Sequence, residues 1–407
     1  MTVTSRSLLS LLTLPLILTL TSTSTSAFET IENPFVGGDP ENGWTYLPPV
    51  PTADLHLNWP ITGTDSVMPV YQSAALDDSA ITRAIIVPGG KPRDSWSYWI
   101  TIKNILSYSA EIDPTINAST ISIMSPVFLA SVDVEAGAAN ATQLYWSKSG
   151  WFSGTYAEGP NADDKISSFQ VLDDLVAHYA DKERYPNLQE IIFAAHSAGS
   201  QFFQRYAALR IPTEDDSIIH YIPANPGSFV WLVEDRPAPN DTCADVDRYK
   251  YGLSSGFPGY STGNVNEIGR EGVVERYRSR NVHYAQGTVG SGQIPVEHFL
   301  TQVLFLPADD GPGDTACEAV TQGSTHLERG ENFVDMLNLN GGMPLNHTID
   351  WVEGVSHQND QMFNSTALRT RMFISATIPS TGLRPLRKRE VKAKAAGRGF
   401  KQGLQLS

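Results

Sequence analysis

From about residue 80 onward, short apolar runs alternate with segments that carry apolar residues at helical spacing. The runs have the length of buried strands and lie at 83–88, 120–126, 190–195, 218–222, 282–285 and 348–352. Three of the intervening segments, 96–108, 166–179 and 201–209, are predicted to be helices, and 166–179 has its apolar residues at the spacing of one buried face. Strands that alternate with helices form a mostly parallel central sheet with helices on both faces. The chain is therefore predicted to have an α/β fold.

The sequence Ala195-His-Ser-Ala-Gly199 follows one of these strands and begins a helix. Small residues two positions either side of a serine permit the strained strand-to-helix turn that exposes a nucleophile above a sheet. In such a turn the N–H of Ala198 faces a developing oxyanion. A second donor is expected from the loop after an earlier strand, where the Gly90 N–H lies. The alternatives are a buried serine in a tight turn and an ordinary glycine turn.

A nucleophilic serine needs a base, which follows the last strand in this arrangement. His357 stands there, in Gly354-Val-Ser-His357, and is predicted to be the base for Ser197. His298 and His326 remain alternatives.

The triad acid should follow the strand at 282–285, but residues 286–292 contain no carboxylate. Glu297 is the nearest candidate, followed by Asp309 and Asp310. These acids could also belong to a solvated face. The sequence thus predicts the serine and the histidine more firmly than the acid.

Several longer segments resemble a family of serine-hydrolase-like α/β-hydrolases. They are Ile166 to Asp173, Ala195 to Gln201 with Arg205-Tyr206, Lys250 to Leu253, Cys317-Glu-Ala with Gln322-Gly and Glu328-Arg-Gly, and Val352 to His357. The resemblance spans about residues 80–375. It implies the α/β-hydrolase fold. It also implies a Ser197–His357 centre that hydrolyses a carboxylic ester or a related acyl bond. The interval 229–280 breaks the alternation and is rich in Pro, Gly and Tyr, so it is predicted to be a lid insertion, with a plain surface loop as the alternative.

Three residues depart from the pattern of that family. Ala195 replaces a glycine, Pro88 replaces a histidine before the oxyanion loop, and Gly290 stands where the acid is expected. Loss of the acid's orienting role costs about 10⁴ in rate in a serine protease. The alternative function is therefore a catalytically weak or inactive binding protein. A hydrolase of amides or peptides would use the same residues.

The first 27 residues are predicted to be a secretory signal peptide. Arg6 precedes the apolar run Leu8–Leu20, and the small residues Thr25 and Ala27 suit cleavage before Phe28. The run is shorter than the roughly 20 residues of a membrane span, so no membrane anchor is expected. Five Asn-x-Ser/Thr sequons agree with export and predict glycosylation at Asn117, Asn140, Asn240, Asn346 and Asn364.

The two cysteines, Cys243 and Cys317, are expected to form a disulfide in an oxidising compartment. Residues 28–379 are assigned to the hydrolase domain, with an irregular N-terminal arm to about residue 80 and a lid insertion at about 229–280. Residues 380–407 are predicted to be a basic disordered tail, which a dibasic processing protease could cut.

A net charge of −15 argues against a nucleic-acid partner, since the only basic stretch is the C-terminal tail. No metal, nucleotide or flavin motif is present, so no cofactor and no metal is expected. The predicted partner is a small-molecule or lipid-like ester substrate. The protein is accordingly expected to be secreted and extracellular.

Overall fold

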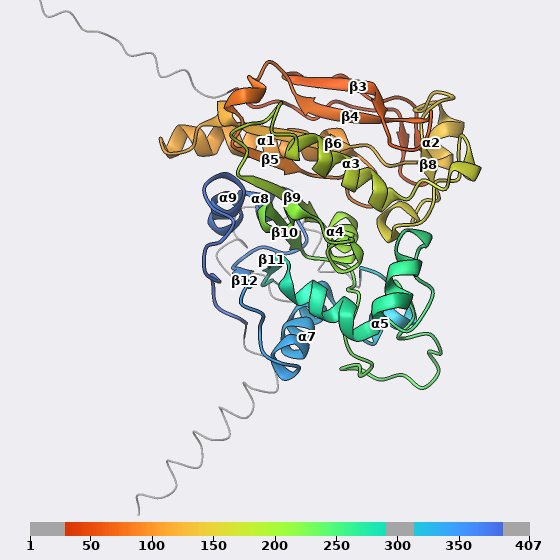
Figure 1. Cartoon of the computed structure of the whole chain (residues 1–407). Helices are drawn as coiled ribbons and strands as arrows, with labels where there is room; N and C mark the ends of the chain where they lie inside the picture. The colour runs from red at the N-terminus through yellow and green to blue at the C-terminus, as the bar shows by residue number, and fades with distance from the viewer. Residues whose placement is uncertain (1–28, 290–312, 386–407) are drawn as a thin grey trace, which may run out of the picture.

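The computed structural model describes residues 29–289 and 313–385. Within these ranges an eight-stranded sheet forms the centre of the molecule. In order across the sheet its strands are β12 (His347–Val352), β11 (Asn281–Gly287), β10 (Ile219–Ala224), β9 (Glu190–His196), β5 (Arg83–Ile86), β6 (Ile121–Pro126), β4 (Val67–Ser73) and β3 (Ala53–Pro60). Figure 1 shows β3 and β4 at one end of the sheet and β12 at the other.

The sheet is parallel except at β4. That strand runs antiparallel to both of its neighbours, β3 and β6. The pairs from β6 across to β12 are all parallel. Because parallel neighbours need crossover connections, the helices between them cover the faces of the sheet.

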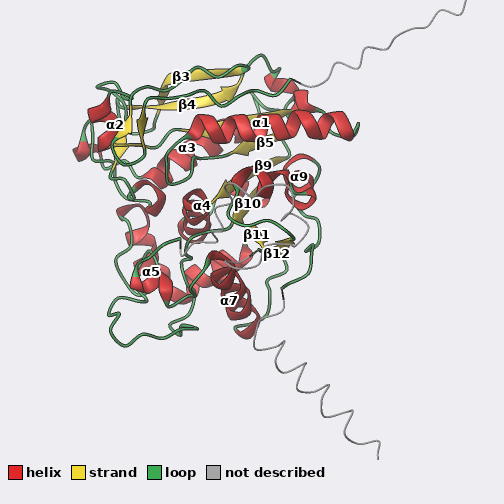
Figure 2. Cartoon of the chain, turned by 180° about the vertical axis from the view of Figure 1, so that it is seen from behind, coloured by secondary structure: helices red, strands yellow, loops and turns green. Residues whose placement is uncertain are grey.

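Helices lie on both faces, as the two opposite views in Figures 1 and 2 show. One face is covered by α3 (Ser168–Ala180), α4 (Ala198–Leu209), α5 (Gly259–Ser279) and α7 (His326–Leu339). The other is covered by α1 (Ser95–Ile112), α8 (Asn359–Asn364) and α9 (Thr366–Phe373). The shorter elements are β1 (Gly38–Asp39), β2 (Gly43–Trp44), β7 (Leu129–Ala130), β8 (Tyr145–Trp146), α2 (Ser131–Ala136) and α6 (Cys317–Val320).

The central strand β9 shows why this sequence makes a sheet that is buried on both sides. Successive side chains of a strand point to opposite faces. Phe193 therefore packs into the core beneath α4, whereas Ile192 and Ala194 pack into the core beneath α1. All three are completely buried, so the strand has to be apolar throughout its length.

The N-terminal part of the domain differs from the sequence prediction. The segment up to about residue 80 was expected to be an irregular arm with short strands, but β3 and β4 are full members of the central sheet. The pattern at 53–60 is interrupted by polar residues because β3 is an edge strand and is largely exposed.

The predicted signal peptide at 1–27 lies outside the described residues, as does the tail from residue 386 onward. Within the described ranges, no helix combines the length and the apolar character that crossing a bilayer requires.

Candidate active site

This protein has the α/β-hydrolase fold. The fold is shown by the strand order, by the reversed β4 next to the edge strand β3 and by the helices on both faces, so the predicted fold class is confirmed. In this fold the nucleophile occupies the turn between a central strand and the helix that follows it. Here that turn joins β9 to α4, and the residue on it is Ser197. The carboxyl end of β9 is therefore the place to look for chemistry.

Ser197 has the strained backbone that the turn requires. Its φ is 59° and its ψ is −123°, a conformation that costs free energy in a non-glycine residue. A Cβ on Gly199 would lie 3.0 Å from Pro88 Cγ, 3.1 Å from Gly89 O and 3.3 Å from Ala195 Cβ. A side chain at 199 therefore fits only if a neighbour shifts by a few tenths of an ångström, while an alanine is accommodated at 195. This crowding explains the pattern of small residues around the serine.

The structure brings Ser197 and His357 together. Ser197 Oγ and His357 Nε2 are 3.0 Å apart, although 160 positions separate the two residues in the chain. Both side chains are only partly buried, so a substrate can reach them. The distance lies within the range in which a general base removes a proton from a hydroxyl.

Two further histidines flank the imidazole of His357. The ring of His326 stacks on it with centroids 3.9 Å apart, and the ring of His196 lies 4.4 Å away. Burial, together with the two neighbouring imidazoles, lowers the pKa of His196 well below its ordinary value. His196 therefore stays neutral beside His357. The alternative base His326 contacts His357 as a stacking partner.

The loop that carries His357 is held against the end of β11. The N–H groups of Thr288 and Val289 donate to the carbonyls of Val352 and Val355, each at 3.0 Å. A Cβ on Gly287 would lie 2.5 Å from Val355 O and 2.7 Å from Ser356 O. Only glycine allows this close approach, so Gly287 fixes how deeply the loop sits.

The loop predicted to supply the second oxyanion donor crosses the start of α4. Its Pro88 and Gly89 contact Gly199, which places it beside the N-terminus of the helix. The first N–H groups of a helix, here beginning with Ala198, have no acceptor within the helix. Burial raises the pKa of Asp94 to about 6, and the backbone N–H groups of Asp94 and Gly90 oppose that shift. The oxyanion role of the Gly90 N–H remains a prediction.

The acid predicted for the triad cannot be placed. Glu297, the further candidates Asp309 and Asp310, and the departing position Gly290 all lie outside the described residues. The alternative base His298 lies there as well. These assignments stay predictions.

The interval predicted to form a lid leaves the carboxyl end of β10 and continues into α5. Its aromatic side chains mostly pack into the protein. Trp231 is buried against Phe333, the hydroxyl of Tyr251 donates to Asp314, and the hydroxyl of Tyr260 donates to Asp173. These contacts fasten the lid interval to the body of the domain.

Cys243 and Cys317 form the predicted disulfide, with their Cα atoms 5.9 Å apart. It joins the lid interval to α6. Among the described residues, the one group of side chains spaced to hold a metal is Cys243, Cys317 and Glu318. Because both thiols are in the disulfide, they offer no thiolate to a metal.

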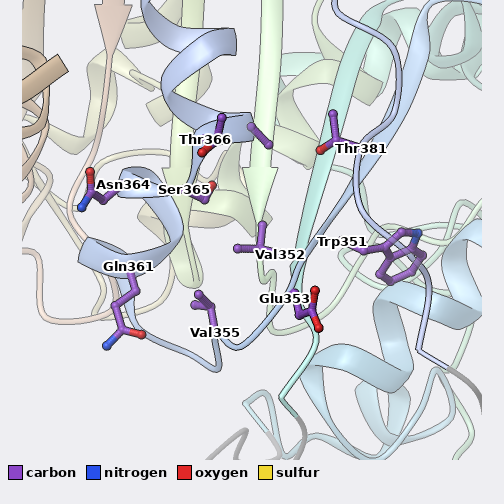
Figure 3. A pocket seen from close by; sticks show the side chains of 10 residues that line it. Trp351, Val352, Glu353, Val355, Gln361, Asn364, Ser365, Thr366 and Thr381 are labelled. Carbon is purple, nitrogen blue, oxygen red and sulfur yellow. The ribbon is translucent and has the colours of Figure 1, made fainter. Parts of the chain in front are cut away.

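A cavity of about 430 Å³ lies beyond the loop of His357, between the end of β12 and the helices α8 and α9. Figure 3 shows Val352, Glu353 and Val355 on the β12 side, with Gln361 and Asn364 on α8. Neither Ser197 nor His357 lines it. The cavity therefore belongs to the outer edge of the sheet and is separate from the candidate site.

Asn225 is a residue of the site that the sequence analysis missed. It directly follows β10, is 2% exposed and has a φ of 45°. Its side chain hydrogen-bonds to Gly287 and to Ser356, next to His357. A polar residue at the carboxyl end of a buried strand and before a proline was the available signal.

No protein-family model matches the chain, and no curated protein matches it. Solved structures of similar fold include a poly(3-hydroxybutyrate) depolymerase from Bordetella parapertussis, with 13% identity, a TM-score of 0.47 and coverage of 84% of this chain and 93% of that one. A poly(aspartic acid) hydrolase from Sphingomonas sp. KT-1 has 18% identity, a TM-score of 0.45 and coverage of 77% and 96%. A siderophore hydrolase from Aspergillus nidulans has 12% identity, a TM-score of 0.42 and coverage of 81% and 98%.

Proposed function

We propose that this protein is a serine hydrolase that cleaves a carboxylic ester or a related acyl bond through an acyl-enzyme at Ser197. The observation that carries the proposal is the 3.0 Å contact between Ser197 Oγ and His357 Nε2 on a strained turn at the end of β9. A serine held in that conformation and paired with a partly exposed imidazole has the geometry of an activated nucleophile.

In the proposed reaction, Ser197 Oγ attacks the acyl carbon while its proton passes to His357 Nε2. Negative charge develops on the former carbonyl oxygen, next to the N-terminus of α4, where the Ala198 N–H and the helix dipole favour it. His357 then returns the proton to the leaving alcohol as the carbon–oxygen ester bond breaks. Water, deprotonated by the same imidazole, hydrolyses the acyl-enzyme and frees Ser197.

The alternative is a binding protein that keeps the fold without turnover, as the glycine at position 290 favours. A panel of nitrophenyl esters of increasing chain length distinguishes the two. The purified full-length protein is expected to hydrolyse at least one ester, and Ser197→Ala is expected to lower that rate by at least about 10⁴-fold.

Ser200→Ala is the matched control for that experiment. Ser200 lies on the first turn of α4, is completely buried and donates to Ala224 O at 2.7 Å. Its loss should leave the ester rate within a few-fold of wild type. An ester rate that is equal in wild type and Ser197→Ala would favour the binding protein.

We also propose that the protein is exported and glycosylated. All five sequon asparagines are exposed on the surface, and the Cys243–Cys317 disulfide suits an oxidising compartment. Expression in a eukaryotic secretory host should deliver the protein to the medium in a form that loses mass on treatment with an N-glycosidase. Retention in the cell with no change of mass would contradict this proposal.

A further inference from the structure

The distance between the nucleophile and the base is set through one dipeptide, Ala224-Asn225, at the end of β10. The Ser197 N–H donates to Ala224 O at 3.1 Å. The next residue, Asn225, donates from Nδ2 to Ser356 O at 2.9 Å, and Ser356 directly precedes His357. Two adjacent residues therefore hold the turn that bears the serine and the loop that bears the histidine.

The same side chain also fastens the end of β11. Asn225 Oδ1 accepts from the Gly287 N–H at 2.8 Å, and the Asn225 N–H donates to Ala285 O at 2.9 Å. Gly287 is the residue on which the His357 loop rests. The amide of Asn225 thus joins three strand ends, those of β10, β11 and β12.

We propose that Asn225 is a positioning residue that keeps His357 within hydrogen-bond reach of Ser197 by clamping Ser356 and Gly287. This inference rests on the proposed function, because it assigns a role within the same site. Asn225 does not touch the reacting atoms. It acts through the backbone on which His357 is mounted.

The chemistry of position 225 requires an amide. Gly287 presents a donor on one side and Ser356 an acceptor on the other, so the side chain must offer both an acceptor and a donor, which an amide does at every pH and a carboxyl group only when protonated. A carboxylate would place an oxygen against Ser356 O. The φ of 45° is also tolerated by asparagine and glycine and disfavours most other residues. Conformation and hydrogen bonding therefore select the same residue.

The amide of Asn225 also approaches His196. Asn225 Nδ2 lies 3.5 Å from His196 Nε2. His196 lies against His357, so the clamp also fixes the ring on one side of the base. This contact is long and contributes less than the two bonds to Ser356 and Gly287.

The test is the rate at which a fluorophosphonate labels the full-length protein as a function of pH. In that reaction Ser197 Oγ forms a bond to phosphorus, fluoride leaves, and the serine proton passes to His357. Asn225→Gly keeps the backbone conformation and removes only the amide. We expect the folded variant to be labelled on the order of 100-fold more slowly at every pH, because a displacement of about 1 Å at a reacting group costs that much.

Asn225→Asp provides a second variant of nearly the same size. It keeps the acceptor for Gly287 but loses the donor to Ser356 when ionised, and it regains a donor when protonated. Its labelling rate divided by that of wild type should therefore rise as the pH falls, whereas the ratio for Asn225→Gly should stay constant. A side chain with a purely structural role would give no such dependence on pH.

Asn104→Ala is the matched control. Asn104 lies on α1 and makes the same pair of bonds, accepting from the Ile31 N–H at 2.9 Å and donating to Ile31 O at 2.8 Å. It should lower the melting temperature and leave the labelling rate unchanged.

A folded Asn225→Gly variant labelled within about threefold of wild type would overturn this inference while the proposed function stood. If Asn225→Gly does not fold, a ratio for Asn225→Asp that does not vary with pH would overturn it equally. Wild type that is not labelled at all would remove both proposals.

Discussion

Two groups of polar side chains, one at the carboxyl end of β9 and one between β12 and α9, are built in opposite ways. At the candidate site, Ser197 and His357 are partly exposed, and the serine has a strained backbone. At the outer edge, Asp350 on β12 and Arg371 on α9 form an ion pair with no exposed surface. One cluster faces solvent, and the other is sealed inside the protein.

The buried pair has a full set of partners. Asp350 also accepts from the N–H and the hydroxyl of Thr381, and Arg371 donates to the carbonyls of Ala376 and Ile378. A buried charge that is paired and hydrogen-bonded in this way fixes the backbone around it. The buried pair thus serves the stability of the fold, whereas the candidate site combines partial exposure with backbone strain.

The largest expected effect concerns the exposed cluster. His357→Gln removes the base while keeping a polar side chain of similar size, so ester hydrolysis should fall by about 10⁴-fold or more. The free energy of unfolding should change by less than about 1 kcal/mol, because the residue is partly exposed. His178 lies on α3 and packs on Trp59 of β3, at the opposite end of the sheet from β12, so His178→Gln should keep the full ester rate. Equal loss of ester hydrolysis in His357→Gln and His178→Gln would contradict the assignment of the active site to Ser197 and His357.

Breaking the buried Asp350–Arg371 pair should lower stability and leave ester hydrolysis unchanged. Arg371→Met leaves Asp350 buried without its cation, which should cost about 3–5 kcal/mol of unfolding free energy in urea titrations. The ester rate per folded molecule should stay at the wild-type level. Arg184→Met breaks an exposed pair with Asp78 and should cost less than about 1 kcal/mol. Equal losses in the two variants would contradict the contrast drawn here.

A third prediction uses the buried histidines near β12. Burial lowers the pKa of His220 and of His347 from 6.5 to about 4. Between these pH values the unfolded chain binds more protons than the folded protein. The free energy of unfolding is therefore unaffected by these two histidines above about pH 6.5 and decreases as the pH falls toward 4. Each histidine contributes at most about 3 kcal/mol to this loss.

Urea titrations between pH 7.5 and 5 measure that dependence. In a His220→Gln, His347→Gln double variant, the slope of stability against pH should be shallower than in wild type. An unchanged slope would show that other groups control it. The ester rate per folded molecule should be the same in the double variant as in wild type.

The smallest expected effect tests the crowding at the serine turn. Gly199→Ala adds a Cβ only 3.0 Å from Pro88 Cγ, so the oxyanion loop must shift by a few tenths of an ångström. The ester rate should fall roughly tenfold, with little change in KM. Gly263→Ala, in α5, adds a Cβ where nothing lies within 4 Å and should be fully active. Full activity in Gly199→Ala would mean that the loop does not contribute to the transition state.

Much of the fold could be predicted because its strands are buried on both faces. The six parallel strands from β5 to β12 were recognised from continuous apolar runs, which a sheet covered by helices requires. The edge pair β3 and β4 was described only as short strands in an irregular arm. β3 is largely exposed, so no face of it demands an apolar pattern. Helix α7 was also missed, since Arg329, Glu331 and Asn332 are polar residues on buried positions.

For the site, the order of the chain was enough to pair Ser197 with His357, because each follows the carboxyl end of its own strand. Asn225 could not be found in this way. Its place at the carboxyl end of a buried strand was visible in the sequence, but its partners are backbone groups of Gly287 and Ser356, which are remote in sequence and leave no residue signature. The disulfide was predicted correctly because only two cysteines exist to form it.

The most direct measurement of the central claim is mass spectrometry of peptides from the protein after reaction with a fluorophosphonate. We expect one phosphonyl adduct, on the peptide that contains Ser197, in wild type and in Ser200→Ala, and none in Ser197→Ala. Folded wild-type protein that carries no adduct, or carries it on another residue, would contradict the assignment of Ser197 as the nucleophile.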